Sequence, residues 1–98
     1  MTDSHTNTYM PKVEVYTTFF CPYCVRAKKL LNKKGVDFQE IDVGKDASLR
    51  EAMTKRAGGI HTVPQIFIDD YHVGGCDDLF SLDIDGDLDK LLSGHSIA

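Results

Sequence analysis

Two cysteines separated by two residues, Cys21 and Cys24, are the side chains of this chain best suited to chemistry. They follow an apolar run and stand where a helix is expected to begin at Pro22, because proline is favoured in the first turn of a helix. Thiols at this spacing can form and open a disulfide locally. Backbone N–H groups and the helix dipole lower the pKa of a cysteine at a helix start. We therefore predict that Cys21 is the nucleophile and that Cys24, one turn further, is the more buried resolving thiol.

The same pair of thiols is compatible with half of a zinc site or with two inert cysteines. A structural zinc ion takes about four ligands, usually from two such pairs, whereas this chain adds only Cys76 and scattered histidines. The acidic run 83–89 resembles a calcium loop, but its sixth position is Leu88 and its twelfth is Gly94, where that loop needs glycine and glutamate. We predict redox chemistry with no metal ligands.

Composition limits the size and the partners of the protein. A chain of 98 residues with 42% hydrophobic content is long enough for one core. Its net charge of −4 argues against a nucleic-acid surface. The first eight residues lack the features of a signal peptide, and 18 consecutive apolar residues occur nowhere. Three cysteines, an odd number, fit a reducing compartment. We expect a cytoplasmic protein with no nucleic-acid or membrane partner.

Hydrophobic periodicity predicts alternating strands and helices. Residues 1–11 are expected to be a disordered leader, 12–92 the folded domain and 93–98 a flexible tail. A strand, a helix and a second strand within about thirty residues imply a parallel crossover. The expected strands are 13–17, 36–43, 62–68 and 71–73. The expected helices are 22–34, 46–57 with Leu49, Ala52, Met53 and Ala57 on one face, a third from Cys76 or Asp77, and a short turn at 88–92.

The first of these helices carries five basic residues that are expected to face solvent. Such a run is typical of a solvated helix face near a C-terminus, where the dipole favours cations. It is also compatible with a phosphate site or with the steering of anionic substrates. These residues are Arg26, Lys28, Lys29, Lys33 and Lys34.

Three segments together resemble the signature segments of dithiol glutaredoxins, most closely the bacterial glutaredoxin 3 type. They are the cysteine motif at 21–24, Thr-Val-Pro at 62–64 and Gly-Gly-Cys-Asp-Asp at 74–78. The resemblance covers about residues 12–92. It implies an α/β, thioredoxin-like fold in which three helices flank a four-stranded mixed sheet, with a cis peptide bond before Pro64.

The resemblance also implies a function, glutathione-dependent thiol–disulfide exchange through Cys21 and Cys24. The implied substrates are protein–glutathione mixed disulfides and protein disulfides, with glutathione as co-substrate, no permanently bound cofactor and a monomeric protein. The backbone of Val63 would pair with the cysteinyl part of glutathione, and the start of the last helix would hold its γ-glutamyl end. The implied glutathione-binding residues are Tyr23, Thr62, Val63, Pro64, Gly75, Cys76, Asp77 and Asp78.

Several alternatives stay open at this stage. The family commonly has a lysine three residues before the first cysteine, where this chain has Thr18, and His61 is the candidate replacement. Cys76 contributes either its backbone N–H alone or a reactive thiol. A thioredoxin-type reductase would usually contain tryptophan, which this chain lacks. An iron–sulfur carrier would hold a cluster between two copies through Cys21 and two glutathiones, and a coloured protein after anaerobic purification would reveal it.

Overall fold

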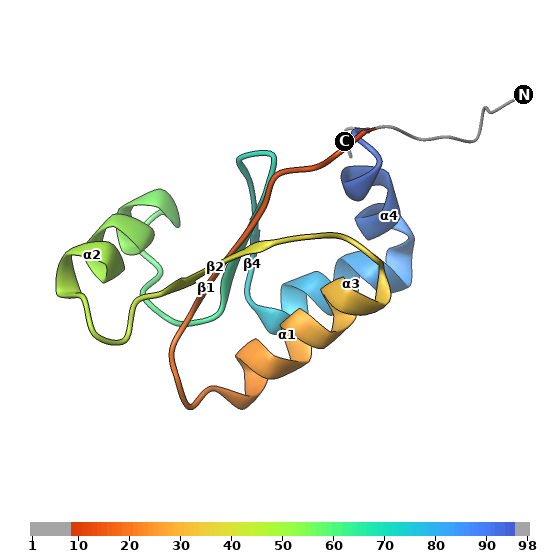
Figure 1. The fold of residues 1–98 in the computed structure, drawn as a ribbon. Helices are drawn as coiled ribbons and strands as arrows, with labels where there is room; N and C mark the ends of the chain where they lie inside the picture. The colour runs from red at the N-terminus through yellow and green to blue at the C-terminus, as the bar shows by residue number, and fades with distance from the viewer. Residues whose placement is uncertain (1–8, 96–98) are drawn as a thin grey trace, which may run out of the picture.

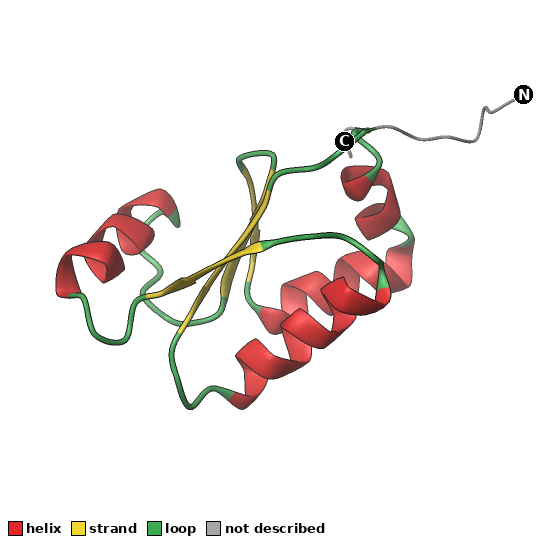
Figure 2. Cartoon of the chain, viewed as in Figure 1, coloured by secondary structure: helices red, strands yellow, loops and turns green. Residues whose placement is uncertain are grey.

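A four-stranded mixed sheet runs through the centre of the computed structural model, which describes residues 9–95 (Figures 1 and 2). The strand order is β2-β1-β3-β4, with β1 parallel to β2 and antiparallel to β3, and β3 antiparallel to β4. The mixed sheet agrees with the prediction. The strands are β1 (Val13–Thr17), β2 (Gln39–Asp42), β3 (Gln65–Ile68) and β4 (Tyr71–Gly74).

Helices cover both faces of this sheet. One face carries α1 (Pro22–Lys33), α3 (Cys76–Asp85) and the short α4 (Asp87–Leu92), and the other carries α2 (Ala47–Arg56) (Figure 1). The helix α1 turns one apolar stripe to the sheet, as its sequence predicts. That stripe consists of Cys24, Ala27, Leu30 and Leu31. The core under α2 contains Tyr16, Val43, Met53, Ala57 and Phe67.

Two strands are shorter than the sequence predicts, because strand length is set by the pairing partner. The register places Glu14 opposite Gln39 and Tyr16 opposite Gln65. Residues 36–38 therefore run beyond the paired part of β1. Residues 62–64 form a loop ahead of β3, where Pro64 has no N–H to donate to a ladder.

The packing of α2 also differs from the prediction. Met53 is fully buried and Ala57 nearly so, but Leu49 is 40% exposed and Ala52 is exposed as well. The helix contacts the sheet through its C-terminal half, where the guanidinium of Arg56 lies 3.9 Å from the centre of the Phe67 ring. The apolar residues earlier in the helix, Leu49 and Ala52, therefore remain exposed.

The described parts of the predicted leader and tail contact the domain. Residues 1–8 and 96–98 lie outside the described range. The hydroxyl of Tyr9 donates a hydrogen bond to the carboxylate of Asp69, and the Tyr9 ring packs on Gly94. The N–H of His95 donates to the carbonyl of Lys90 at 2.8 Å. Within residues 9–95, every helix is too short or too polar to cross a membrane.

Candidate active site

The two cysteines lie at the first turn of α1, as predicted. Cys21 is the N-cap residue with an extended backbone, and Pro22 occupies the first helical turn. The sulfurs of Cys21 and Cys24 are joined in a disulfide, with the Cα atoms 5.1 Å apart. The Cys21 Sγ also accepts a hydrogen bond from the backbone N–H of Cys24 at 3.1 Å. Cys24 is 1% exposed and Cys21 is 9% exposed, so the outer sulfur belongs to the predicted nucleophile.

The backbone of the 62–64 loop lies next to this disulfide. The Val63–Pro64 peptide bond is cis, as the resemblance implied. The carbonyl oxygen of Val63 lies 3.9 Å from the Cys21 Sγ. Val63 is half-buried and Pro64 is buried, so the backbone just before β3 is fixed beside the reactive sulfur.

The start of α3 supplies the third segment. Gly75 is its N-cap, and the carboxylate of Asp78 accepts the backbone N–H of Gly75 at 2.9 Å, which is the returning half of a capping box. Gly74 has a φ of +113°, and a Cβ at that position would overlap the Asp78 carboxylate. Glycine at position 74 therefore lets Asp78 approach the β4–α3 junction closely.

Cys76 occupies the first position of α3, and its side chain is only 4% exposed. Burial raises the pKa of the Cys76 thiol; the charge of Arg26 acts in the opposite direction as a smaller effect. The Cys76 thiol is therefore a weaker acid than a free cysteine. The structure favours the interpretation in which Cys76 contributes backbone geometry.

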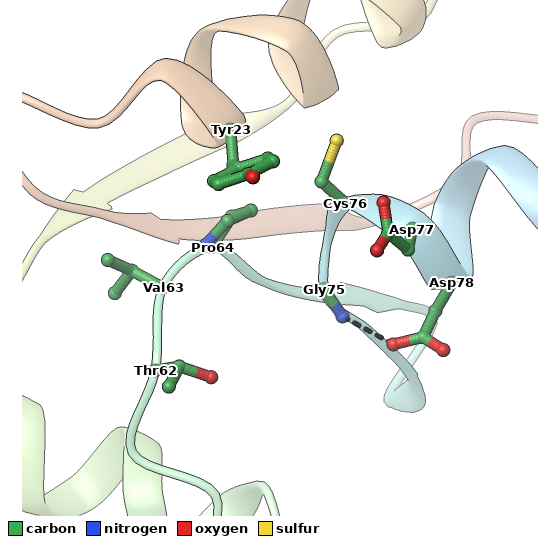
Figure 3. Close-up of a pocket in the computed structure, with 8 residues that line it drawn as sticks. All are labelled: Tyr23, Thr62, Val63, Pro64, Gly75, Cys76, Asp77 and Asp78. Carbon is green, nitrogen blue, oxygen red and sulfur yellow. Dashed lines mark hydrogen bonds between the residues drawn. The ribbon is translucent and has the colours of Figure 1, made fainter.

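These three segments surround a cavity of about 210 Å³ (Figure 3). All eight residues that the family resemblance implied for glutathione binding line this cavity, so they do lie close together. Their role in binding stays a prediction. They are Tyr23 from α1, then Thr62, Val63 and Pro64 from the loop, and Gly75, Cys76, Asp77 and Asp78 from the start of α3.

The structure directs attention from His61 to Arg50 as the basic residue near this loop. Neither side chain lines the cavity, but that of His61 is exposed whereas that of Arg50 is half-buried. The carbonyl oxygen of His61 accepts hydrogen bonds from Arg50, at 2.9 Å from Nη2 and 3.3 Å from Nε. These hydrogen bonds hold the Arg50 guanidinium against the backbone of His61, the residue just before the 62–64 loop. Sequence reasoning missed Arg50 because it lies on a different element, α2; a basic residue in the helix before the Thr-Val-Pro segment was the available signal.

A partly buried polar network, which the sequence analysis did not predict, connects β3 and β4 to the 62–64 loop. Gln65 is 2% exposed, and its Oε1 lies 2.6 Å from the Nε2 of His72. Its amide nitrogen donates a longer hydrogen bond, 3.4 Å, to the hydroxyl of Thr62. An amide oxygen can only accept, so the Nε2 of His72 must carry the proton. The His72 ring stacks on Phe67, with centroids 4.8 Å apart.

Comparison with known proteins shows what this arrangement is similar to. Residues 13–73 match the family model described as glutaredoxin. Glutaredoxin 3 of Escherichia coli is 59% identical over 83 residues, which cover 85% of this chain and 99% of the relative. Among solved structures, a glutaredoxin from Brucella melitensis has a TM-score of 0.77 and 50% identity, covering 90% of this chain and 96% of its own. A buckwheat glutaredoxin–glutathione complex has a TM-score of 0.79 and 31% identity, covering 86% and 78%.

Proposed function

Because this chain belongs to the glutaredoxin family and is a thiol–disulfide oxidoreductase, we propose that it uses glutathione to reduce protein–glutathione mixed disulfides and protein disulfides. The observation that carries the proposal is the cavity beside the Cys21–Cys24 disulfide, which is lined by peptide backbone and by a helix start. The buckwheat relative was solved in complex with glutathione. In this proposal the protein acts as a monomer in the cytoplasm, where reduced glutathione is available.

Each part of the tripeptide has a matching feature in the cavity. The N–H groups at the start of α3 suit the γ-glutamyl carboxylate, and the carboxylate of Asp77 or Asp78 suits its ammonium group. The backbone of Val63, fixed beside the Cys21 sulfur, suits the cysteinyl amide. Arg50 supplies the positive charge for the glycyl carboxylate in place of the lysine that this chain lacks at position 18.

In the proposed reaction, the Cys21 thiolate attacks the glutathione sulfur of a mixed disulfide. The substrate thiolate leaves and takes up a proton, and glutathione stays bonded to Cys21. A second glutathione thiolate then attacks that adduct, which releases glutathione disulfide and restores Cys21. With a protein disulfide, the Cys21 thiolate attacks one substrate sulfur, forms a mixed disulfide with it and releases the other as a thiolate. Cys24 then attacks the Cys21 sulfur, which releases the second substrate thiolate and forms the Cys21–Cys24 disulfide. Two glutathione molecules reduce this disulfide and leave as glutathione disulfide.

The test is the reduction of a small glutathione mixed disulfide, coupled to glutathione reductase. We expect turnover that depends on glutathione. The same assay with thioredoxin reductase as electron donor should give little turnover. Equal rates with the two donors, or no rate with glutathione, would contradict the proposal.

A further inference from the structure

A second hollow, of about 320 Å³, lies between α1 and α3 and takes no part in the proposed reaction. We call it the α1–α3 groove. We propose that it binds an acidic and partly apolar segment of the protein substrates, next to their reacting cysteine. This inference rests on the proposed function and adds a substrate class to it. The groove is lined by Arg26, Lys29, Leu30, Lys33, Phe80 and Asp83.

Two of the five basic residues predicted on α1 are already neutralised by ion pairs. The Lys28 ammonium lies 2.9 Å from the carboxylate of Glu40, and this hydrogen bond lowers the pKa of Glu40. The Lys34 ammonium lies 2.6 Å from Asp83 and 2.9 Å from Asp89. Hydrogen bonds to these two carboxylates raise the pKa of Lys34. The one acidic residue of the groove, Asp83, is therefore committed to a lysine outside it.

The other three basic residues, Arg26, Lys29 and Lys33, all line the groove. Among residues 9–95, none of the three has a carboxylate within ion-pair distance. The groove therefore carries three positive charges without an ion-pair partner. Lys34 pairs with both Asp83 and Asp89 and leaves one negative charge beside them, so the local balance is still positive on a chain whose net charge is −4. Such local reversal of charge attracts and orients an anionic partner.

The floor of the groove is apolar, and this distinguishes the groove from an ordinary solvated helix face. Leu30 is 6% exposed and Phe80 is half-buried. The Arg26 guanidinium lies 5.5 Å from the centre of the Phe80 ring, within the range of a cation–π contact. A free phosphate would contact only the basic side chains and would gain nothing from Leu30 and Phe80. A polypeptide that alternates acidic and apolar side chains can contact both the basic and the apolar residues. The groove therefore favours a peptide segment.

The groove lies along α1 and α3, the same two helices whose first turns border the glutathione cavity, and the two hollows share no lining residue. Tyr23 lines the glutathione cavity, and Arg26 and Lys33 follow it three and ten positions later on one side of α1. The helices α1 and α3 lie side by side (Figure 1). At a rise of 1.5 Å per residue, Arg26 to Lys33 lie about 8–18 Å along the axis from Cys21. An extended chain covers this distance in roughly two to six residues, so the acidic residues should lie that far from the substrate cysteine.

The test compares two glutathionylated peptides that differ only in charge. Each has one cysteine; one peptide has glutamate at four positions between two and six residues from it, and the other has glutamine there. With the wild-type protein at low salt, we expect kcat/KM to be roughly fivefold higher for the acidic peptide, the effect of a few exposed ion pairs. The preference should shrink as salt is added. Equal kcat/KM for the two peptides would overturn the inference.

Two double variants with the same change in net charge locate the effect. Lys29→Gln with Lys33→Gln should bring the ratio of the two kcat/KM values close to one. Lys12→Gln with Lys55→Gln, at exposed positions outside the groove, should keep the wild-type ratio. An equal fall of the ratio in both variants would overturn the assignment to the groove. Failure of the proposed function is distinct, because wild type would then not reduce a small mixed disulfide with glutathione.

A binding measurement tests the nature of the occupant. Cysteine-free peptides and tripolyphosphate are titrated into the oxidised protein while backbone NMR shifts of α1 and α3 are followed. We expect a Glu/Leu peptide to bind more tightly than a Glu/Ser peptide of equal charge, because only the former uses Leu30 and Phe80. Tripolyphosphate binding more tightly than the Glu/Leu peptide would overturn the peptide assignment in favour of a general polyanion site.

Discussion

The Sγ of Cys21 lies 3.1 Å from the backbone nitrogen of Cys24 and accepts its hydrogen bond. In the reduced protein this N–H, together with the start of α1, stabilises a thiolate at Cys21. Cys24 lies inside the helix and is almost completely buried, so it has neither the free N–H groups nor the access to a substrate. The two thiols therefore have unequal roles.

We predict that Cys21→Ser abolishes all disulfide reductase activity, because no other thiol is placed to attack the substrate. Cys24→Ser should keep turnover of glutathione mixed disulfides and lose reductions that pass through the internal disulfide. Steady-state assays with a small mixed disulfide and with a protein disulfide separate the two reactions. Equal losses in both variants would refute the assignment of the nucleophile.

The hydrogen bond between His72 and Gln65 leads to a second prediction. In His72→Phe the ring stack on Phe67 is kept, but the Gln65 amide oxygen loses its donor. We expect the free energy of unfolding to fall by about 1–3 kcal/mol, the cost of an unsatisfied buried polar group. Released from His72, the Gln65 amide no longer orients the Thr62 hydroxyl, so KM for glutathione should rise several-fold while kcat changes little.

The control for this prediction is His72→Gln, which restores an N–H donor without the aromatic ring. If the hydrogen bond is what matters, this variant recovers most of the glutathione KM that His72→Phe loses. Chemical denaturation and glutathione-dependent kinetics on the three proteins provide the measurements. A His72→Phe protein with wild-type KM would show that the network supports the fold alone.

Arg50 and His61 provide a third prediction, because the structure assigns the positive charge beside the 62–64 loop to Arg50. Arg50→Ala should raise KM for glutathione roughly tenfold, as expected for the loss of a charge-assisted hydrogen bond. His61→Ala keeps the backbone carbonyl that holds Arg50 and should leave KM near the wild-type value. The opposite ranking of the two variants would restore His61 as the carboxylate anchor.

The site residues that could be predicted from the sequence have a local signal, whereas those that could not be predicted depend on contacts between distant elements. Cys21, Pro64 and Gly75 were predicted because each signals its own local geometry: a helix cap, a proline turn or a glycine junction. Their convergence on one cavity followed from the family resemblance. The Arg50 contact and the groove depend on side chains that meet only when α2 approaches the 62–64 loop or α1 approaches α3. No local pattern encodes those distances.

The strand ends illustrate the same limit. Residues 36–38 and 62–64 have strand-like composition, but a strand exists only where a partner offers N–H and C=O groups. The ladder with β2 begins at Glu14 and Gln39, one residue inside β1, and the ladder with β3 ends at Tyr16 and Gln65, next to Pro64, which has no N–H to donate. The uneven burial of α2 likewise depends on where Arg56 meets Phe67, which the spacing of its apolar residues does not reveal.

The last prediction concerns Cys76 and pH. Because burial raises the pKa of this thiol, the thiolate fraction of Cys76 at pH 7 is lower than that of a free cysteine. Its reaction with oxidised glutathione or iodoacetamide should be slow at neutral pH and should accelerate only above the usual thiol range. Cys76→Ser keeps the backbone N–H at the start of α3 and should retain catalysis.

Mass spectrometry of wild type and Cys76→Ser after treatment with oxidised glutathione at pH 7 and pH 9.5 measures this directly. At pH 7 we expect the two proteins to show the same adducts and the same activity. An additional glutathione or a covalent dimer, present only in wild type, should appear at the higher pH. If that extra adduct already forms quickly at pH 7, the helix start outweighs burial at this position, and Cys76 is a reactive thiol at the edge of the glutathione cavity.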